Sequence, residues 1–277
     1  MSDAPAVLLD VRDGIAQITF NRPERMNSWG QDIASGLFDA LRSYDQDDAV
    51  RAIVVTGSGK AFCAGADLSR RREAEAGTDA PAPRRPREPR AASIYGWQVR
   101  KPIIAAINGA AVGVGMTLPL TFDIRIAALD AKLGFVFVSR GLVPELGSTW
   151  ILPRLIGISR ASELLMSGRI VLGKEAAEIG LVSEALPADG VLPRAREIAT
   201  QIAVNAAPNS VALTKRMLWE SLGIADPGLA AAREQKMFTW SGTQPDTREG
   251  MRAFFEKRPA RWTGKPSVDL PPSDPLP

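Results

Sequence analysis

An uncharged stretch between Lys101 and Asp123, PIIAAINGAAVGVGMTLPLTF, limits most strongly what this chain can fold into. Its length raises the possibility of a membrane span. However, Asn108–Gly109 is a turn signal, Pro119 interrupts any single long helix, and the flanks lack the asymmetry of basic residues that orients a lone span. The stretch therefore predicts a buried strand, a tight turn and a buried helix inside a globular protein.

Strands and helices alternate on either side of this stretch. Residues 7–20, VLLDVRDGIAQITF, predict two strands joined by an Asp13–Gly14 turn. Residues 31–47 carry apolar side chains at helical spacing, and RAIVVTG at 51–57 is a continuous apolar run typical of a strand covered on both faces. This order recurs further along the chain, which indicates an α/β fold with buried strands.

The C-terminal part has the pattern of helices without convincing strands. We therefore expect an α/β core over residues 1–190, a helical region over 191–265 and a disordered tail over 266–277. Residues 70–92 combine prolines and arginines with too few apolar side chains to offset the cost of ordering, which predicts a mobile loop.

Composition excludes several kinds of chemistry. The chain contains no histidine, so catalytic pairs and zinc sites that need histidine are excluded, and a general base must be a carboxylate or a perturbed Lys, Cys or Tyr. A single cysteine, Cys63, and an N-terminus without a signal-peptide pattern predict a cytoplasmic protein. The net charge of +3 arises within residues 70–90, where a solvated loop explains it more simply than nucleic-acid binding.

Two buried strands run into small residues, in IVVTGSGKAFCAGADL and IAAINGAAVGVGMTL. Neither segment has the glycine spacing of a Walker loop or of a dinucleotide-binding turn. Small residues let a ligand approach the main chain, and a helix that begins there offers free N–H groups. The two turns could converge on an anion or serve packing only, and the residues alone leave both interpretations open.

A set of motifs, in order and across nearly the whole chain, resembles the enoyl-CoA hydratase/isomerase (crotonase) family. The motifs are NRPERMNSW, GSGKAFCAGADL, KPIIAAINGAAVGVGMTL, DIRIAA, GLVPELGSTWILPRLIG, AAEIGLVSEALP and GMRAFFEKRPARW. The resemblance implies an α/β fold with a crotonase-like ββα spiral core, a homotrimer or hexamer, and an acyl-CoA substrate bound without metal or further cofactor. It also implies an oxyanion hole formed by the backbone N–H groups of Ala66 and Val114.

The resemblance extends to other positions. Contacts with coenzyme A are expected from Arg25, Met26, Lys60, Ala64, Phe254 and Lys257, of which the last two often act in a neighbouring subunit. Thr117, Phe137 and Trp150 are expected in or beneath the acyl pocket. For Cys63 we expect a small buried apolar role, and for Asp67 the role of a structural carboxylate.

The chain departs from the hydratase pattern at two positions. Hydratases of this family hold a water between two glutamates, and Thr117 and Phe137 stand at those positions here. Glu145 instead matches the single catalytic glutamate of some Δ3,Δ2-enoyl-CoA isomerases. The resemblance thus implies an isomerase with Glu145 as its base, and we expect burial beside the acyl chain to raise the pKa of this carboxyl.

Four alternatives stay open beside this interpretation. Glu145 could be a helix-end carboxylate that only complements the dipole. The chain could catalyse another reaction of the family, weak hydration included, or bind acyl-CoA without catalysis. The least favoured alternative is RNA binding through the arginines of 70–90.

Overall fold

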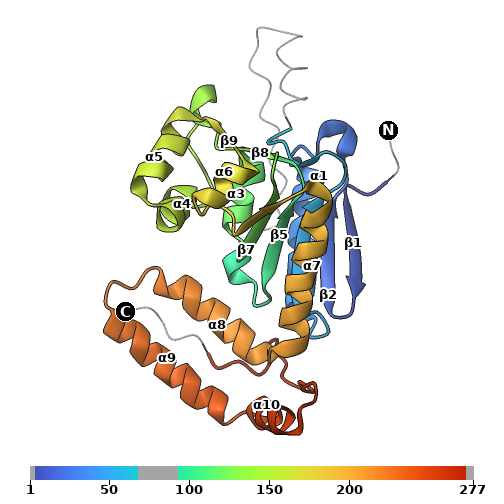
Figure 1. Ribbon diagram of the computed structural model, residues 1–277, viewed down its shortest axis with the longest axis vertical. Coiled ribbons are helices and arrows are strands. Elements are labelled where there is room, and N and C mark those ends of the chain that lie inside the picture. Colours follow the sequence, from blue (N-terminus) through green and yellow to red (C-terminus); the bar gives the residue numbers. More distant parts are fainter. Residues whose placement is uncertain (1–3, 68–92, 273–277) are drawn as a thin grey trace, which may run out of the picture.

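The computed structural model describes residues 4–67 and 93–272 (Figure 1). The mobile loop predicted for 70–92 and the last five residues of the predicted disordered tail, 273–277, lie outside the described residues. The prediction of an α/β core followed by helices is confirmed, as the element order shows.

A larger sheet forms the centre of the core. Its strands, in spatial order, are β1 (Val7–Arg12), β2 (Ile15–Phe20), β3 (Ala52–Gly57), β5 (Ile103–Ile107), β7 (Ile124–Ala128) and β10 (Glu184–Leu186). β1 and β2 pair as the predicted antiparallel hairpin, and the other neighbours are parallel, with Val54 opposite Ile104 in β3 and β5. β3 and β5 are buried along their whole length, as their continuous apolar sequences predict.

A smaller sheet carries the residues that follow the buried strands. Its strands, in spatial order, are β4 (Ala61–Cys63), β6 (Ala110–Val112), β8 (Lys132–Gly134) and β9 (Ile170–Leu172). β4, β6 and β8 are parallel, and β9 is antiparallel to β8. Both small-residue turns of the sequence therefore lie beside this sheet.

Helices cover both sheets. They are α1 (Gln31–Gln46), α3 (Val114–Leu120), α4 (Ser148–Ile156), α5 (Ile158–Ser167), α6 (Gly173–Glu178) and α7 (Ala188–Asn205), with short 3₁₀ turns η1 (Pro23–Arg25), η2 (Gly96–Gln98) and η3 (Val138–Arg140). α7 crosses the larger sheet over β3, β5 and β7, while α4, α5 and α6 gather beside the smaller sheet (Figure 1). Because α7 packs on the sheet, the α/β layers extend beyond residue 190, where we expected them to end.

The uncharged stretch folds as predicted. It forms β5, a turn at Asn108–Gly109, β6 and the buried helix α3, which ends one residue after Pro119. Within the described ranges, no helix has the length and apolar character needed to cross a membrane.

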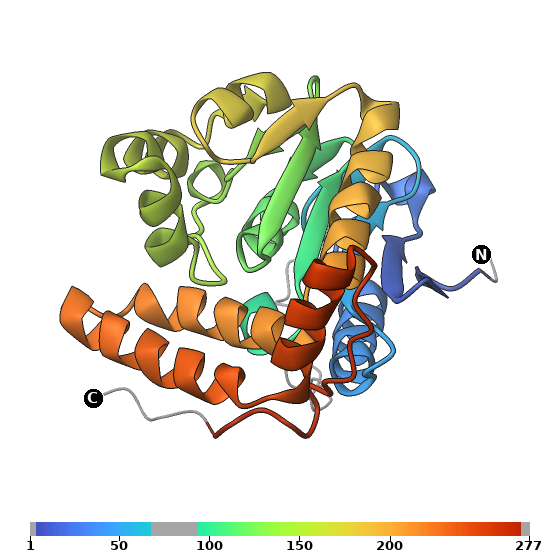
Figure 2. The same cartoon turned by 60° about the horizontal axis from the view of Figure 1, so that its bottom comes forward.

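The C-terminal helices α8 (Pro208–Ser221), α9 (Pro227–Gly242) and α10 (Pro245–Glu256) form a separate group, and α8 and α9 lie side by side in both views (Figures 1 and 2). The chain then returns to the core. The Ser267 N–H donates to Asp48 Oδ1 (3.1 Å), and Arg100 Nη1 donates to the Pro266 carbonyl (3.0 Å). Residues 266–272, which we expected to belong to the disordered tail, are therefore held by hydrogen bonds to segments distant in sequence.

Candidate active site

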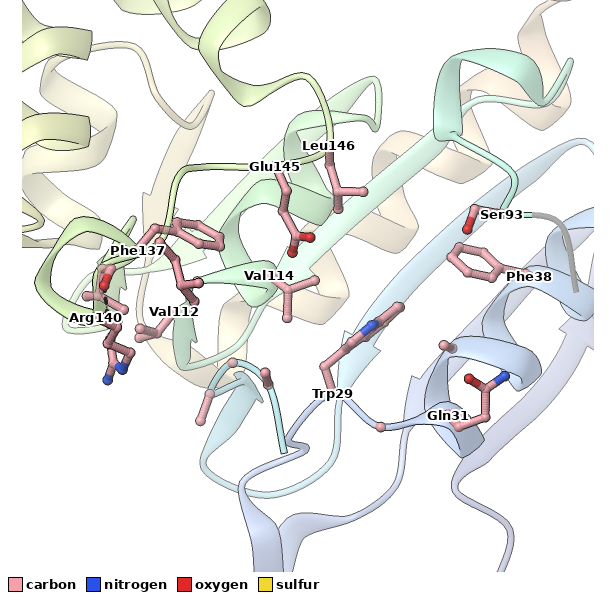
Figure 3. A pocket seen from close by; sticks show the side chains of 18 of the residues that line it. Trp29, Gln31, Phe38, Ser93, Val112, Val114, Phe137, Arg140, Glu145 and Leu146 are labelled. Atoms are coloured by element: carbon pink, nitrogen blue, oxygen red, sulfur yellow. Dashed lines mark hydrogen bonds between the residues drawn. The ribbon is translucent and has the colours of Figure 1, made fainter. Parts of the chain in front are cut away.

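A cavity of about 450 Å³ lies between α1, the two small-residue turns and the segment that precedes α4 (Figure 3). Five of the residues predicted for the site line it together: Ala64, Ala66, Val114, Phe137 and Glu145. They come from four separate stretches of the chain, which the two sheets bring to one place.

The first turn presents the backbone of Ala66. Ala66 forms an isolated parallel bridge with Trp29, in which the Trp29 N–H donates to the Gly65 carbonyl (2.7 Å) and the Asp67 N–H donates to the Trp29 carbonyl (2.9 Å). Since these bonds use the groups on either side of Ala66, its own N–H points away from Trp29. No acceptor for that N–H is found among residues 4–67 and 93–272.

The second turn presents the backbone of Val114. Gly113 adopts φ +59° and ψ −123°, a conformation that residues with a side chain rarely adopt, and its N–H donates to the Gly134 carbonyl (2.8 Å). α3 begins at Val114, so the Val114 N–H has no acceptor within the helix, and the described chain supplies none elsewhere.

The two turns adjoin. A Cβ added to Gly113 would lie 4.0 Å from Gly65 Cα, and one added to Gly65 would lie 3.1 Å from the Val112 carbonyl oxygen. Two backbone N–H groups without an acceptor among the described residues, those of Ala66 and Val114, thus line one cavity on adjoining turns. This arrangement can accept hydrogen bonds to a developing oxyanion.

Glu145 lies on the opposite wall. Its carboxylate extends toward the space between Val114 and Trp29 (Figure 3). A tight turn fixes the main chain here, because Leu146 has φ +56° and Gly147 has φ +72°, and the Ser148 N–H donates to the Glu145 carbonyl (3.1 Å). The side chain is exposed in the free chain, and the burial that we expect beside a bound acyl chain stays a prediction.

Aromatic side chains supply much of the remaining wall. Trp29, Phe38 and Phe137 line the cavity, and Trp29 packs edge to face with Phe38 at 6.1 Å. Of these three aromatic residues, the sequence analysis named only Phe137 as a pocket residue. The missed signal is a second face of α1, since Gln31, Ala34, Ser35 and Phe38 follow the i, i+3, i+4, i+7 spacing of one helix face.

Two predicted pocket residues lie outside the cavity lining. Thr117 is fully buried, because the next turn of α3 directs it into the packed interior, and its hydroxyl has no hydrogen-bond partner in the described part of the chain. Trp150 is on the outer side of α4, where the Arg154 guanidinium lies 4.0 Å from its ring centroid. Neither side chain contributes to the wall that Phe137 helps to form.

Of the residues expected to contact coenzyme A, some lie at the cavity and others lie away from it. Ala64 lines the cavity, and its N–H donates to the Met26 carbonyl (3.0 Å), which places the η1 segment beside it. Lys60 is exposed. Phe254 and Lys257 are exposed at the end of α10 and do not line the cavity of their own chain.

Charges near the first turn are partly paired. Asp67 Oδ2 lies 3.4 Å from Arg25 Nη1 and 3.7 Å from Arg22 Nη1, which fits the structural role expected for this carboxylate.

The neighbouring Cys63 is buried, and burial raises the pKa of its thiol to about 11, so it remains an uncharged packing residue. Within the described ranges, no group of His, Cys, Asp or Glu side chains is placed to hold a metal ion.

Comparison with known proteins gives consistent matches along the chain. The sequence model of the enoyl-CoA hydratase/isomerase family matches residues 10–265. An enoyl-CoA hydratase of Alternaria alternata is 40% identical over 251 residues, covering 90% of this chain and 83% of that protein. The 1,2-epoxyphenylacetyl-CoA isomerase of Escherichia coli (strain K12) is 33% identical over 265 residues, covering 94% and 98%.

A solved structure agrees with these sequence matches. The crystal structure of a probable enoyl-CoA hydratase/isomerase from Mycobacterium abscessus has a TM-score of 0.84 to this chain at 39% identity, and the match covers 93% of this chain and 98% of that one. The predicted crotonase-like fold is thereby confirmed.

Proposed function

The chain belongs to the enoyl-CoA hydratase/isomerase family and is an enzyme of that family, and we propose that it catalyses Δ3,Δ2-enoyl-CoA isomerisation with Glu145 as its single base. One observation carries the proposal. The carboxylate-bearing Glu145 lines the same cavity as the backbone N–H groups of Ala66 and Val114, for which residues 4–67 and 93–272 supply no acceptor. A carboxylate and two backbone N–H donors in one cavity are the groups needed for proton transfer next to a thioester carbonyl.

The backbone groups would act on the carbonyl oxygen. Removal of a proton from C2 of an acyl-CoA gives an enolate, whose charge develops on the thioester oxygen. Hydrogen bonds from the Ala66 and Val114 N–H groups would stabilise that charge, and the loss of one such donor costs about 2.7–4 kcal/mol in comparable sites. Backbone donors keep this ability whatever side chain they carry, so Val114 serves as well as a glycine.

Glu145 would move one proton. In a 3-enoyl-CoA, the C2–H bond breaks as Glu145 takes the proton, and the electron pair delocalises over the dienolate. Return of the same proton to C4 leaves the double bond between C2 and C3. No water is added and no second carboxylate is needed, which fits a chain that has Thr117 and Phe137 where hydratases of the family have glutamates.

The relatives support a second candidate. One is named a hydratase and another an isomerase of 1,2-epoxyphenylacetyl-CoA, so a different enolate reaction that uses Glu145 is the alternative. A screen of 2-enoyl, 3-enoyl and dienoyl-CoA thioesters with identification of products separates the candidates. Conversion of the 3-enoyl substrate alone supports the isomerase, whereas product from the 2-enoyl substrate alone supports hydration.

The decisive variant is Glu145→Gln, which preserves volume and hydrogen bonding but cannot accept a proton. We expect it to keep the affinity for acyl-CoA and to lose about 10²–10⁴-fold in isomerisation and in exchange of C2 protons with deuterated water. Glu163→Gln is the matched control, because this exposed glutamate binds Arg169 outside the cavity. Wild-type exchange in the Glu145 variant would show that the base lies elsewhere.

We also propose binding without metal or redox cofactor and assembly as a homotrimer or hexamer. Support for an assembly comes from large apolar side chains on α9 and α10 that are about three-quarters exposed in the single chain, namely Phe238, Phe254 and Phe255. Phe254 and Lys257 could then reach coenzyme A bound to a neighbouring subunit. Sedimentation equilibrium tests this: the mass of three or six chains is expected, and a monomer at micromolar concentration contradicts it.

A further inference from the structure

The indole of Trp29 extends into the middle of the cavity, below Glu145 (Figure 3). Its main chain is fixed by the two hydrogen bonds of the bridge with Ala66. Its ring packs edge to face against Phe20 (6.1 Å, 80°) and Phe38 (6.1 Å, 70°). Trp29 is therefore held in one orientation, in register with a residue of the proposed oxyanion hole.

The indole N–H of Trp29 has no acceptor in the part of the chain that the structure describes. Two of the other five tryptophans use this group: Trp219 Nε1 donates to Asp123 Oδ1 (2.8 Å) and Trp262 Nε1 donates to the Val204 carbonyl (2.9 Å). Trp29 is partly buried, so water in the open cavity can solvate its N–H while the site is empty.

The polar side chains of Gln31, Ser35 and Ser93 do not occupy the indole N–H of Trp29, which stays available as a donor in the cavity. Gln31 and Ser35 lie on α1 and bond to each other, with Gln31 Nε2 3.0 Å from Ser35 Oγ. In Figure 3, Gln31 and Ser93 lie on the far side of Trp29 from Val114. If the thioester carbonyl binds to the N–H groups of Ala66 and Val114, this donor, in register with Ala66, would meet the acyl carbons that follow the carbonyl.

A bound acyl chain would replace the water on this N–H. If the chain is hydrocarbon at that point, the N–H loses its water and gains no partner, whereas an oxygen atom there restores a hydrogen bond. Sites that hold an unpaired polar group discriminate against ligands that cannot pair it. The Trp29 N–H therefore favours one class of acyl group over another.

We propose that Trp29 is a specificity-determining residue and that the substrates of this enzyme carry an oxygen acceptor, such as a carbonyl, hydroxyl or ether oxygen, on the acyl carbons beyond C2. The proposal rests on the proposed function, because it takes the cavity as the acyl site of an enolate-forming enzyme. It adds a substrate class that Glu145, Ala66 and Val114 do not specify.

The test compares the dissociation constants of hexanoyl-CoA, 4-oxohexanoyl-CoA and 5-oxohexanoyl-CoA, measured by calorimetry. In the wild-type protein, at least one oxo compound is expected to bind about tenfold more tightly than hexanoyl-CoA. Trp29→Phe keeps an aromatic ring and removes the N–H, so this ratio should fall to near one. Phe38→Leu is the matched control, since it alters an aromatic wall without a donor and should weaken all three ligands alike.

Equal binding of the three compounds by the wild-type protein overturns the proposal, whether or not the variant folds. So does a Trp29→Phe variant that keeps the wild-type ratio, or one that weakens all ligands equally, which would make Trp29 a packing residue. Exchange of C2 protons of the bound compounds in deuterated water is followed in parallel. Its absence in the wild-type protein contradicts the proposed reaction, while the binding ratio still decides the role of Trp29.

Discussion

Thr117 and Thr56 are both buried threonines, but only one of the two hydroxyls is paired. The Thr56 hydroxyl donates to the Ala106 carbonyl (2.9 Å) and so links β3 to β5. The Thr117 hydroxyl, on α3, has no partner in the described chain although the residue is fully buried. An unpaired buried hydroxyl destabilises the folded state relative to an apolar group of the same shape.

Valine has nearly the shape of threonine and tests this difference. We expect Thr117→Val to leave the free energy of unfolding unchanged or to raise it by about 1 kcal/mol, because an unpaired polar group is removed. Thr56→Val should lower it by about 1–2 kcal/mol, because the Ala106 carbonyl loses its donor. Urea unfolding followed by circular dichroism measures both. If the Thr117 variant loses as much stability as the Thr56 variant, an ordered water must pair with the Thr117 hydroxyl.

Single residues of the site were predictable to different degrees. Glu145 could be found because its motif is distinctive and histidine is absent, and Ala66 and Val114 because their turns match known motifs. Trp29 was missed, since nothing in its neighbourhood of the sequence shows that a bridge to Ala66 aims it at the cavity.

At the scale of elements, strands and helices with a clear local signal were predicted correctly. The hairpin is encoded by alternating apolar residues around Asp13 (φ +53°) and Gly14 (φ +77°), which tolerate the left-handed conformation of the turn. β3 was recognisable from its continuous apolar run, because both of its faces are covered.

The second glycine turn depends on how closely α3 approaches β4, and the sequence alone does not show this approach. A Cβ on Gly115 would lie 2.0 Å from the Cys63 carbonyl oxygen, so α3 can pack against β4 only with glycine there. That contact sets where α3 begins and hence where the Val114 N–H lies. The spacing of the glycines cannot reveal it, because the partner strand is some fifty residues away along the chain.

Contacts between segments far apart in sequence also explain why the end of the chain was predicted wrongly. Residues 266–272 have a composition typical of a tail, yet Ser267 bonds to Asp48, on a segment that precedes β3. Local composition measures how much apolar area a segment can bury, and it does not register hydrogen bonds that a distant carboxylate supplies.

At the scale of the whole molecule, a buried ion pair fastens the C-terminal helices to the core. Lys215, on α8, places Nζ 2.7 Å from Asp123 Oδ2 and donates to the Lys101 carbonyl (2.8 Å). Asp123 also accepts from the Ile103 N–H (2.8 Å) and from Trp219 Nε1 (2.8 Å), one helical turn beyond Lys215. Burial lowers the pKa of Lys215, and the charge of Asp123 opposes this shift. The pair thus joins α8 to Asp123, directly before β7, and the bonds to the Ile103 N–H and the Lys101 carbonyl extend this link to the start of β5.

Lys215→Met tests how much this attachment contributes. The variant keeps a long apolar side chain but leaves the carboxylate of Asp123, which is only 17% exposed, without the charge of Lys215, so we expect the free energy of unfolding to fall by about 3 kcal/mol. Arg194→Met is the matched control, because the Arg194–Glu184 pair joins side chains that are 35% and 39% exposed and should contribute less than about 1 kcal/mol.

Two measurements test the effect of Lys215→Met. Urea unfolding gives the free energy, and limited proteolysis followed by mass spectrometry shows whether α8, α9 and α10 become cleavable before the core does. We expect early cleavage between α8 and α10 in Lys215→Met and none in Arg194→Met, because the C-terminal helices are attached to the sheet through Lys215 and Trp219. Equal losses of stability in the two variants, or cleavage that begins in the core, would show that apolar packing holds α8 and that the buried ion pair adds nothing to the attachment.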